Sequence, residues 1–228
     1  MTVFKYAMKR GFMNPTSLVI NCVFPLAVVI LMFGDGSGGR GYYMLAMALM
    51  FGAFFMSAGV QNDKLQGVIT RIMAGPITMR NYLLQNLLAA IVPMLGLIVI
   101  LCALGMILHD WGLTFAIGLA VCYAFLAITS IGLSFVWSCL FKDKEASTIA
   151  FSFIMMFVAL ISGLMIPLSL LPTPIFYAGA LFPAHWATRA IENLVEYGSF
   201  TGMYWLSILA MFLFAVAYLL YGGKRRIG

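Results

Sequence analysis

The sequence predicts an all-α integral membrane protein with six transmembrane helices, and three observations carry this prediction. Of the 228 residues, 64% are hydrophobic and only 9% are charged, whereas a soluble domain has about a quarter charged residues. The apolar residues form long runs, and a span needs about 20 of them. Short polar segments separate the runs, which leaves no room for a soluble domain. We therefore expect one transmembrane domain over residues 1–228.

The six spans are expected at residues 17–33, 42–60, 83–108, 113–141, 146–167 and 203–222. Pro25 lies inside the first span, where a proline kinks a helix because it has no amide hydrogen. In the second span, small residues spaced by four, such as Ala48 and Gly52, favour close helix packing in lipid. We interpret His109 and Asp110 as residues of a tight turn between the third and fourth spans, not as half of a metal site.

A basic amphipathic segment, residues 1–13, precedes the first span. Phe4 and Met8 share one side of the predicted helix, and Lys5 and Lys9 share another. Such a segment binds in the interface of an anionic leaflet, so we expect an N-terminal interfacial elbow helix. The small-residue cleavage pattern of a secretory signal is absent, and the first span is expected to stay uncleaved.

The longest polar interruption covers residues 61–87. Leu65, Val68, Ile69 and Ile72 recur there at helical spacing, with charged residues beside this stripe. A glycine–proline pair at 75–76 then ends the predicted helix. The pattern leaves two interpretations open: an apolar ridge that docks a soluble protein, or a helix that lies on the bilayer surface.

Residues 162–193 are apolar but broken by prolines at positions 167, 172, 174 and 183. The pieces are too short to span a bilayer, so we expect broken helices in a re-entrant hairpin that enters and leaves the same leaflet. Irregular backbone at that depth needs protein or water around it. Arg189 and Glu192, at the end of this segment, are expected in the headgroup region.

The basic residues are distributed unevenly over the predicted loops. With the N-terminus in the cytoplasm, eleven of the 13 Lys and Arg residues are cytoplasmic and two, Arg40 and Arg189, are outside. This bias follows the positive-inside rule and predicts that both termini are cytoplasmic. The cytoplasmic set is Lys5, Lys9, Arg10, Lys64, Arg71, Arg80, Lys142, Lys144, Lys224, Arg225 and Arg226.

The sequence carries no motif for catalysis. It has no phosphate-binding loop, zinc-hydrolase motif or nucleophile–base arrangement, and its four cysteines lie in apolar segments without metal-ligand spacing. The spans also lack the charged residues that proton- or sodium-coupled transporters place at membrane depth. We therefore expect a non-catalytic chain without its own cofactor or metal, without nucleic-acid partners, and driven by a separate motor.

Ser130, Ser134 and Ser138 repeat every fourth residue along the predicted fourth span. Small hydroxyl residues at this spacing favour close helix packing, with each hydroxyl bonded to a backbone carbonyl. The alternative is a polar seam that lines a transport pathway, with Ser162 after the fifth span as a further lining residue. The sequence leaves both interpretations open.

Two segments together resemble the ABC-2 type permease family, the membrane subunits of a class of ATP-driven exporters. In the loop after the second span, the family has an acidic residue, a glycine, a helix rich in Leu and Arg, a proline and a Tyr-Leu-Leu start to the third span. The corresponding residues here are Asp63, Gly67, Arg71, Pro76 and Tyr82-Leu83-Leu84. The second segment reads Ser162-Gly163, then Ile166-Pro167-Leu-Ser-Leu-Leu-Pro172, then Phe182-Pro183 before an external amphipathic helix. The chain departs from the family at Gln61 and Gln66, where glutamates are frequent, and at Phe182, where an asparagine is usual.

The resemblance implies a half-transporter, in which two copies, or this chain and a related permease, form the pathway in a bacterial cytoplasmic membrane. Separate ABC ATP-binding subunits, which hold ATP and Mg²⁺, would drive export of an amphipathic small molecule, drug or peptide from the cytoplasm or inner leaflet. The helix between the second and third spans would be the coupling helix that contacts this ATPase. Its predicted contact residues are Asp63, Lys64, Leu65, Gln66, Gly67, Val68, Ile69, Arg71 and Ile72. The alternatives are an ion-coupled carrier and a non-transporting immunity or assembly protein.

Overall fold

The computed structural model describes residues 2–13, 19–31, 39–68, 71, 79–138, 140, 141 and 143–224. Nine α-helices and no strands occur in these ranges, so the all-α prediction is confirmed. The elements are α1 (Thr2–Met13), the π-helix η1 (Val19–Val23), α3 (Phe24–Leu31), α4 (Arg40–Leu65), α6 (Met79–His109), α7 (Leu113–Ser138), α8 (Lys144–Ile161), the 3-10 helix η2 (Leu168–Leu170), α9 (Thr173–Gly179), α10 (Pro183–Tyr197) and α11 (Gly202–Lys224).

Two helical segments in the described ranges are long and apolar enough to cross a membrane, Leu84–His109 in α6 and Leu113–Trp137 in α7. Four shorter apolar helices overlap the other predicted spans: Val19–Leu31, Arg40–Met56, Glu145–Ile161 and Gly202–Tyr218. At two places the helix end differs from the predicted span end. α4 continues to Leu65 instead of ending near residue 60, and α8 ends at Ile161 instead of residue 167.

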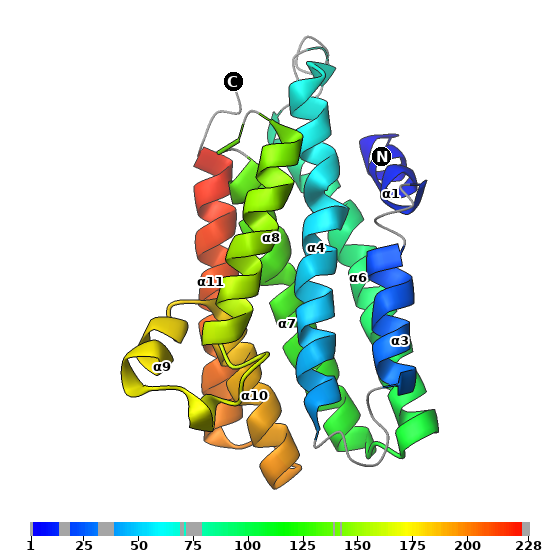
Figure 1. Ribbon diagram of the computed structural model, residues 1–228. Coiled ribbons are helices and arrows are strands. Elements are labelled where there is room, and N and C mark those ends of the chain that lie inside the picture. Colours follow the sequence, from blue (N-terminus) through cyan, green and yellow to red (C-terminus); the bar gives the residue numbers. More distant parts are fainter. Residues whose placement is uncertain are drawn as a thin grey trace.

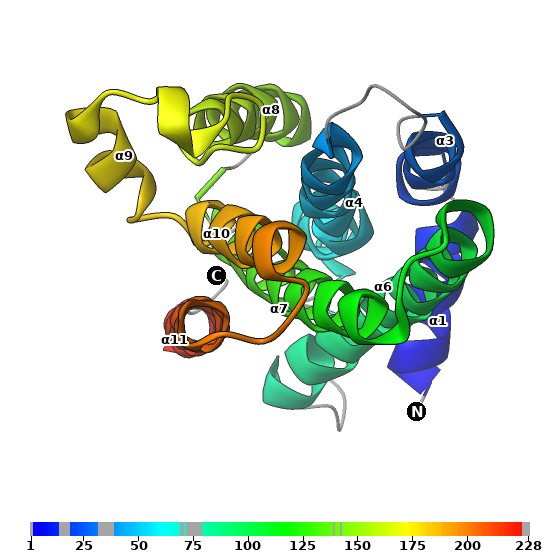
Figure 2. The same ribbon diagram turned by 90° about the horizontal axis from the view of Figure 1, so that it is seen from below.

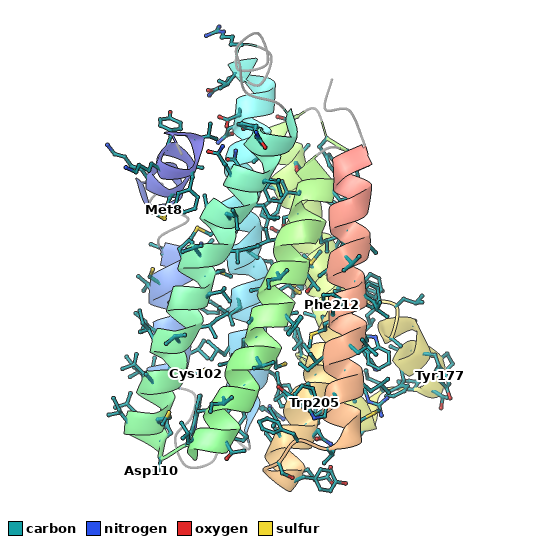
Figure 3. All side chains as sticks on the ribbon, turned by 180° about the vertical axis from the view of Figure 1, so that it is seen from behind. Met8, Cys102, Asp110, Tyr177, Trp205 and Phe212 are labelled. Atoms are coloured by element: carbon teal, nitrogen blue, oxygen red, sulfur yellow. The ribbon has the colours of Figure 1, made fainter. Side chains whose placement is uncertain are left out.

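The helices α3, α4, α6, α7, α8 and α11 run side by side along one axis (Figure 1). α1 lies across one end of this bundle, next to the end of α4 and the start of α6 (Figures 1 and 2). α9 and α10 lie at the opposite end, and α9 projects sideways from the bundle. Tyr177 of α9 is 68% exposed and points away from the other helices (Figure 3).

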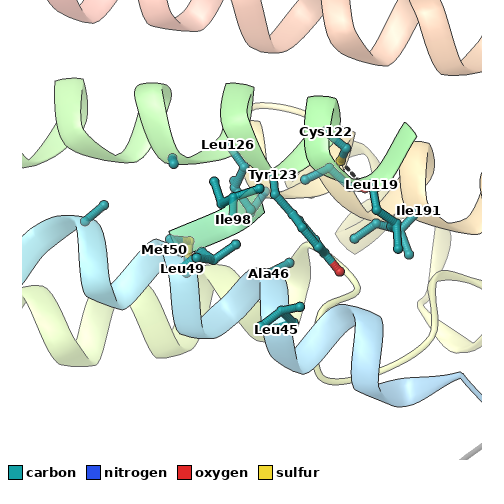
Figure 4. Close-up of a cluster of buried hydrophobic side chains, with 14 of the residues drawn as sticks. Leu45, Ala46, Leu49, Met50, Ile98, Leu119, Cys122, Tyr123, Leu126 and Ile191 are labelled. Atoms are coloured by element: carbon teal, nitrogen blue, oxygen red, sulfur yellow. Dashed lines mark hydrogen bonds between the residues drawn. The ribbon is translucent and has the colours of Figure 1, made fainter. Parts of the chain in front are cut away.

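The central helix is α7, which packs against α4, α6, α10 and α11. Its Leu119, Tyr123 and Leu126 are fully buried, and Figure 4 shows Tyr123 reaching toward α4. The Tyr123 hydroxyl donates a hydrogen bond to the Tyr42 carbonyl, at 2.9 Å. On the other side, the Tyr204 hydroxyl of α11 donates to the Gly118 carbonyl, also at 2.9 Å. Buried hydroxyls need such partners, and here they bind α7 to α4 and α11.

The predicted kink at Pro25 takes the form of η1, a π-helical turn directly before α3. Proline cannot donate the next helical hydrogen bond, so a change of helical register at this point is expected. Asn21 of η1 is buried and lies against Gly52 of α4. A β-carbon on Gly52 would come within 2.4 Å of the Asn21 side-chain oxygen. The small residue predicted to favour close packing therefore does so here.

The prediction of broken helices after α8 is confirmed for the described residues. Pro167 and Pro172 precede η2 and α9, and Pro183 is the first residue of α10. α10 does not lie free at the surface, because its apolar face is buried against α7 and α11. Entry of this segment into a membrane leaflet stays a prediction.

Candidate functional site

The predicted coupling stretch begins on α4 and not on a helix of its own. Asp63, Lys64 and Leu65 form the last turn of α4. The sequence predicts one separate helix that carries both Leu65 and Ile72, and this prediction is wrong at the N-terminal end, which belongs to α4. Gly67 then adopts a left-handed backbone, with φ +66°. Glycine is favoured there because it has no β-carbon to clash, and this conformation ends an α-helix.

A new helical turn starts after this break. Val68 and Arg71 are helical, and the Arg71 amide donates to the Gly67 carbonyl at 3.3 Å. Ile69 and Ile72 lie outside the described residues, as do the side chains of Lys64 and Leu65. The exposed part of the described stretch consists of Gln66 and Arg71, with Gly67 and Val68 half-buried.

Asp63 faces into the protein. Its side chain is only 8% exposed, and its carboxylate accepts a hydrogen bond from the hydroxyl of Tyr82, in the first turns of α6. Tyr82 is itself buried, and its carbonyl accepts a hydrogen bond from the Asn86 side-chain amide at 2.9 Å. Hydrogen bonds to ionised groups are stronger than neutral ones. The geometry thus assigns Asp63 an internal partner at the end of the bundle.

α1 is attached to the same end of α6. The amide of Phe4, in the first turn of α1, donates to the Gln85 side-chain oxygen at 3.1 Å. The first amides of a helix have no partner within the helix, so Gln85 satisfies one of them. Lys5 and Lys9 remain exposed, as an interfacial helix with a basic outer side requires.

The serines of α7 are packed inside the chain. Ser130 and Ser134 are buried, and the Ser134 hydroxyl donates to the Ser130 carbonyl at 2.7 Å. This is the packing arrangement described for small hydroxyl residues. The Ser138 side chain is outside the described residues, and Ser162 follows the far end of α8. The lining of a pathway by the four candidate serines stays a prediction.

Comparison with known proteins decides the family. A family model described as "ABC-2 family transporter protein" matches residues 16–223. The chain belongs to the ABC-2 transporter family. Such a chain is a permease in ABC transport, a membrane subunit that is typically non-catalytic and associates with an ABC ATP-binding subunit. A comparison with curated proteins finds no match.

In this ABC-2 transporter, sequence reasoning missed a buried cluster where α8, α9 and α10 meet. His185 of α10 is fully buried, and neither ring nitrogen has a hydrogen-bond partner among the described residues. Its ring lies edge-on to Phe176 of α9, with centroids 4.9 Å apart. Burial, helped by the nearby Arg189 guanidinium, lowers the pKa of His185 to about 4. The ring is therefore neutral near pH 7.

Arg189 and Glu192 of the ABC-2 transporter are only partly exposed, although the sequence predicted both in the headgroup region. The Arg189 guanidinium lies 5.5 Å from the Phe176 ring centroid, within the range of a cation–π contact. The Glu192 carboxylate accepts the Leu168 amide, and burial raises its pKa. The prolines and the amphipathic pattern of residues 183–197 indicate short helices here. Neither feature predicts which polar side chains are buried.

Within the part of the chain that the structure describes, no three His, Cys, Asp or Glu residues are placed to hold a metal ion. The polar residues of the ABC-2 transporter instead hold helices together at the two ends of the bundle. The end that carries α1 and the Gln66–Arg71 stretch is the candidate functional site, because it combines exposed polar residues with a break between two long helices.

Proposed function

We propose that this chain is the membrane subunit of an ATP-driven exporter, with ATP hydrolysed on a separate subunit that docks at the α1 end of the bundle. The observation that carries the proposal is the family match over residues 16–223. The break at Gly67 supports the docking site, because it presents the exposed Gln66 and Arg71 between α4 and α6. These two helices would receive the force of the motor.

In this proposal the apolar segments that contain α3, α4, α6, α7, α8 and α11 all cross the membrane, with the α1 end in the cytoplasm. The apolar character of the six helices supports the crossing, and the positive-inside bias of the sequence supports the orientation. Two copies, or this chain and a relative, would enclose the pathway. The cargo would be an amphipathic small molecule, drug or peptide, taken from the cytoplasm or inner leaflet.

The first experiment tests whether the chain binds an ABC ATP-binding subunit and stimulates its ATP hydrolysis. The chain is expressed with the ABC ATP-binding subunit of its host, purified in lipid nanodiscs, and assayed for co-purification and for stimulation of ATP hydrolysis. We expect a stable complex with stimulated hydrolysis. Solute uptake by the purified chain alone under an ion gradient would instead identify an ion-coupled carrier, and a stable complex without any turnover would indicate a non-transporting protein.

The second experiment tests the docking stretch. Gly67→Val forces a β-branched residue into the left-handed conformation, at a cost of about 1–2 kcal/mol, and should change the course of the chain after α4. Gly198→Val is the matched control, because Gly198 has φ +62° at the opposite end and, like Gly67, has open space around its β-position. We expect loss of ATPase stimulation in Gly67→Val only. Equal stimulation in both variants would contradict the docking site.

A further inference from the structure

The two helices on either side of the predicted docking stretch are joined by side chains of the chain itself. Asp63 lies in the last turn of α4 and Tyr82 lies near the start of α6, and the stretch that would contact the motor lies between them. The Tyr82 hydroxyl donates to the Asp63 carboxylate, and both residues are buried. A buried hydrogen bond to a carboxylate is stronger than an exposed one, because water does not compete for either partner.

Tyr82 and its neighbours make contacts in three directions. Tyr82 binds Asp63 of α4, Gln85 accepts the Phe4 amide of α1, and Asn86 donates to the Tyr82 carbonyl within α6. The start of α6 therefore ties α4 and α1 together at one end of the bundle. α1 also packs against both α6 and α4.

The backbone between the two helices contains a point where bending costs little. Gly67 is left-handed, and among the residues that the structure describes no atom beyond its chain neighbours lies within 4 Å of its β-position. A load applied to residues beyond Gly67 could be absorbed by rotation there. α4 and α6 also pack against each other and against α1, and a hydrogen-bonded bridge between the two helix ends would make both helices follow such a load together.

We propose that the Asp63–Tyr82 pair is this bridge: a positioning pair that makes the ends of α4 and α6 move as one unit when the docking stretch is displaced. The inference rests on the proposed function, and it gives Asp63 a different role from the motor contact predicted from sequence. Asp63 transmits force inside the membrane subunit, while Gln66 and the residues after it meet the ATPase. Tyr82 has no contact with cargo in this scheme.

The test measures how α4 and α6 move relative to each other. Spin labels are placed at Asn62→Cys on α4 and Leu84→Cys on α6, which are half-buried and 45% exposed. Cys22 and Cys139 are replaced by serine, whereas Cys102 and Cys122 are buried and stay. The distance distribution is recorded for the full chain in nanodiscs, alone and in complex with its ATP-binding subunit, before and after trapping with ADP and vanadate.

We expect one narrow distance that does not change on trapping, because the two helix ends move together. Tyr82→Phe and Asp63→Ala should replace it with a broad distribution and abolish ATPase stimulation, while the complex still forms. Asp63→Asn should retain the narrow distance, because its amide oxygen can still accept the Tyr82 hydroxyl. Tyr204→Phe is the matched control, since it removes a buried hydroxyl bonded to the Gly118 carbonyl elsewhere in the bundle.

A narrow distance in Tyr82→Phe and Asp63→Ala would overturn the proposal, as would equal broadening in Tyr204→Phe. A different result would show that the proposed function itself is wrong. In that case no ATP-binding subunit associates even with the unmodified chain, while the distances in the chain alone still report whether Asp63 and Tyr82 hold the two helix ends together.

Discussion

At the scale of single residues, close approach between helices depends on positions that tolerate no side chain. Gly105 of α6 is the clearest, because a β-carbon there would lie 2.3 Å from the ring of Trp111. Trp111 is buried in the turn between α6 and α7, where its ring also contacts Tyr42 at a centroid distance of 5.3 Å. The glycine thus makes room for the aromatic contact that closes this end of the bundle.

Gly105→Ala should therefore destabilise the protein, by about 1–3 kcal/mol for an overpacked core site. Gly96→Ala is the control on the same helix, because no described neighbouring atom lies within 4 Å of the Gly96 β-position. Alanine there should be neutral or should stabilise the protein by up to about 1 kcal/mol. Thermal unfolding in detergent measures both. Equal midpoints for the two variants would contradict the tight fit against Trp111.

The buried His185 predicts that the stability of the α9–α10 end of the bundle depends on pH. Burial holds the folded pKa near 4, whereas an opened segment would have the ordinary value of about 6.5. Between these values the opened state binds more protons, so the stability of the α9–α10 region is full above about pH 6.5 and falls as the pH drops toward 4. The loss amounts to about 3 kcal/mol at most.

Proteolysis of the η2–α9 segment as a function of pH measures this effect. We expect cleavage to accelerate between pH 6.5 and 4 in the unmodified chain and not to accelerate in His185→Phe. In that variant the nearby Glu192 still titrates, but its raised pKa stabilises the folded region as the pH falls. A pH profile that is identical in both proteins would exclude His185 as its source.

At the scale of elements, α8 is attached to the bundle through a few aromatic contacts. Phe151 of α8 stacks on Phe54 of α4, with ring centroids 3.8 Å apart, and the Trp137 indole of α7 donates to the Ser147 carbonyl at 3.1 Å. In lipid, helices gain little from the hydrophobic effect, because lipid tails are as apolar as their side chains. Packing and hydrogen bonds must therefore hold α8.

Phe151→Ala removes the stacked pair and leaves a cavity at a buried site, and should destabilise the protein by about 3–5 kcal/mol. Phe153→Ala is the matched control on the same helix, because Phe153 is 73% exposed and its loss should leave the midpoint unchanged. Thermal unfolding in lipid nanodiscs compares the two. A larger effect from Phe153 would mean that the outer face of α8 carries an interface.

At the scale of the whole molecule, the helix ends are sorted in space. α1, the end of α4, the start of α6 and the end of α11 lie at one end of the bundle (Figure 1), and the α6–α7 turn lies at the other. Which of these two ends faces the cytoplasm stays a prediction from the basic residues. The arrangement places Lys5 and Lys9 at one end and Asp110 at the other (Figure 3).

An impermeant thiol reagent tests this sidedness. In right-side-out vesicles we expect Gly112→Cys to be labelled and Tyr6→Cys to be protected, with the pattern reversed in inverted vesicles. Both positions are exposed in the structure, and Gly112 has open space around it. Labelling of Tyr6→Cys from outside would place the docking stretch on the wrong face of the membrane and would contradict the proposed function.

Much of this architecture could be predicted from the sequence. Long apolar runs, the prolines at 167, 172 and 183, and the polar stretch after the second span place helices and breaks, because hydropathy and backbone restrictions act locally along the chain. The resemblance to ABC-2 permeases also follows from local motifs, and the family match confirms it. These signals do not depend on what each helix touches.

The surroundings of the polar residues are decided by the tertiary structure. Asp63 is followed by an exposed stretch, yet its carboxylate is turned toward Tyr82; His185 and Ser134 are polar, yet both are fully buried. An amphipathic face can meet water, headgroups or another helix with the same residue pattern. Only the packing of residues far apart in the chain, such as α4 against α6 and α10 against α7, selects one of these environments.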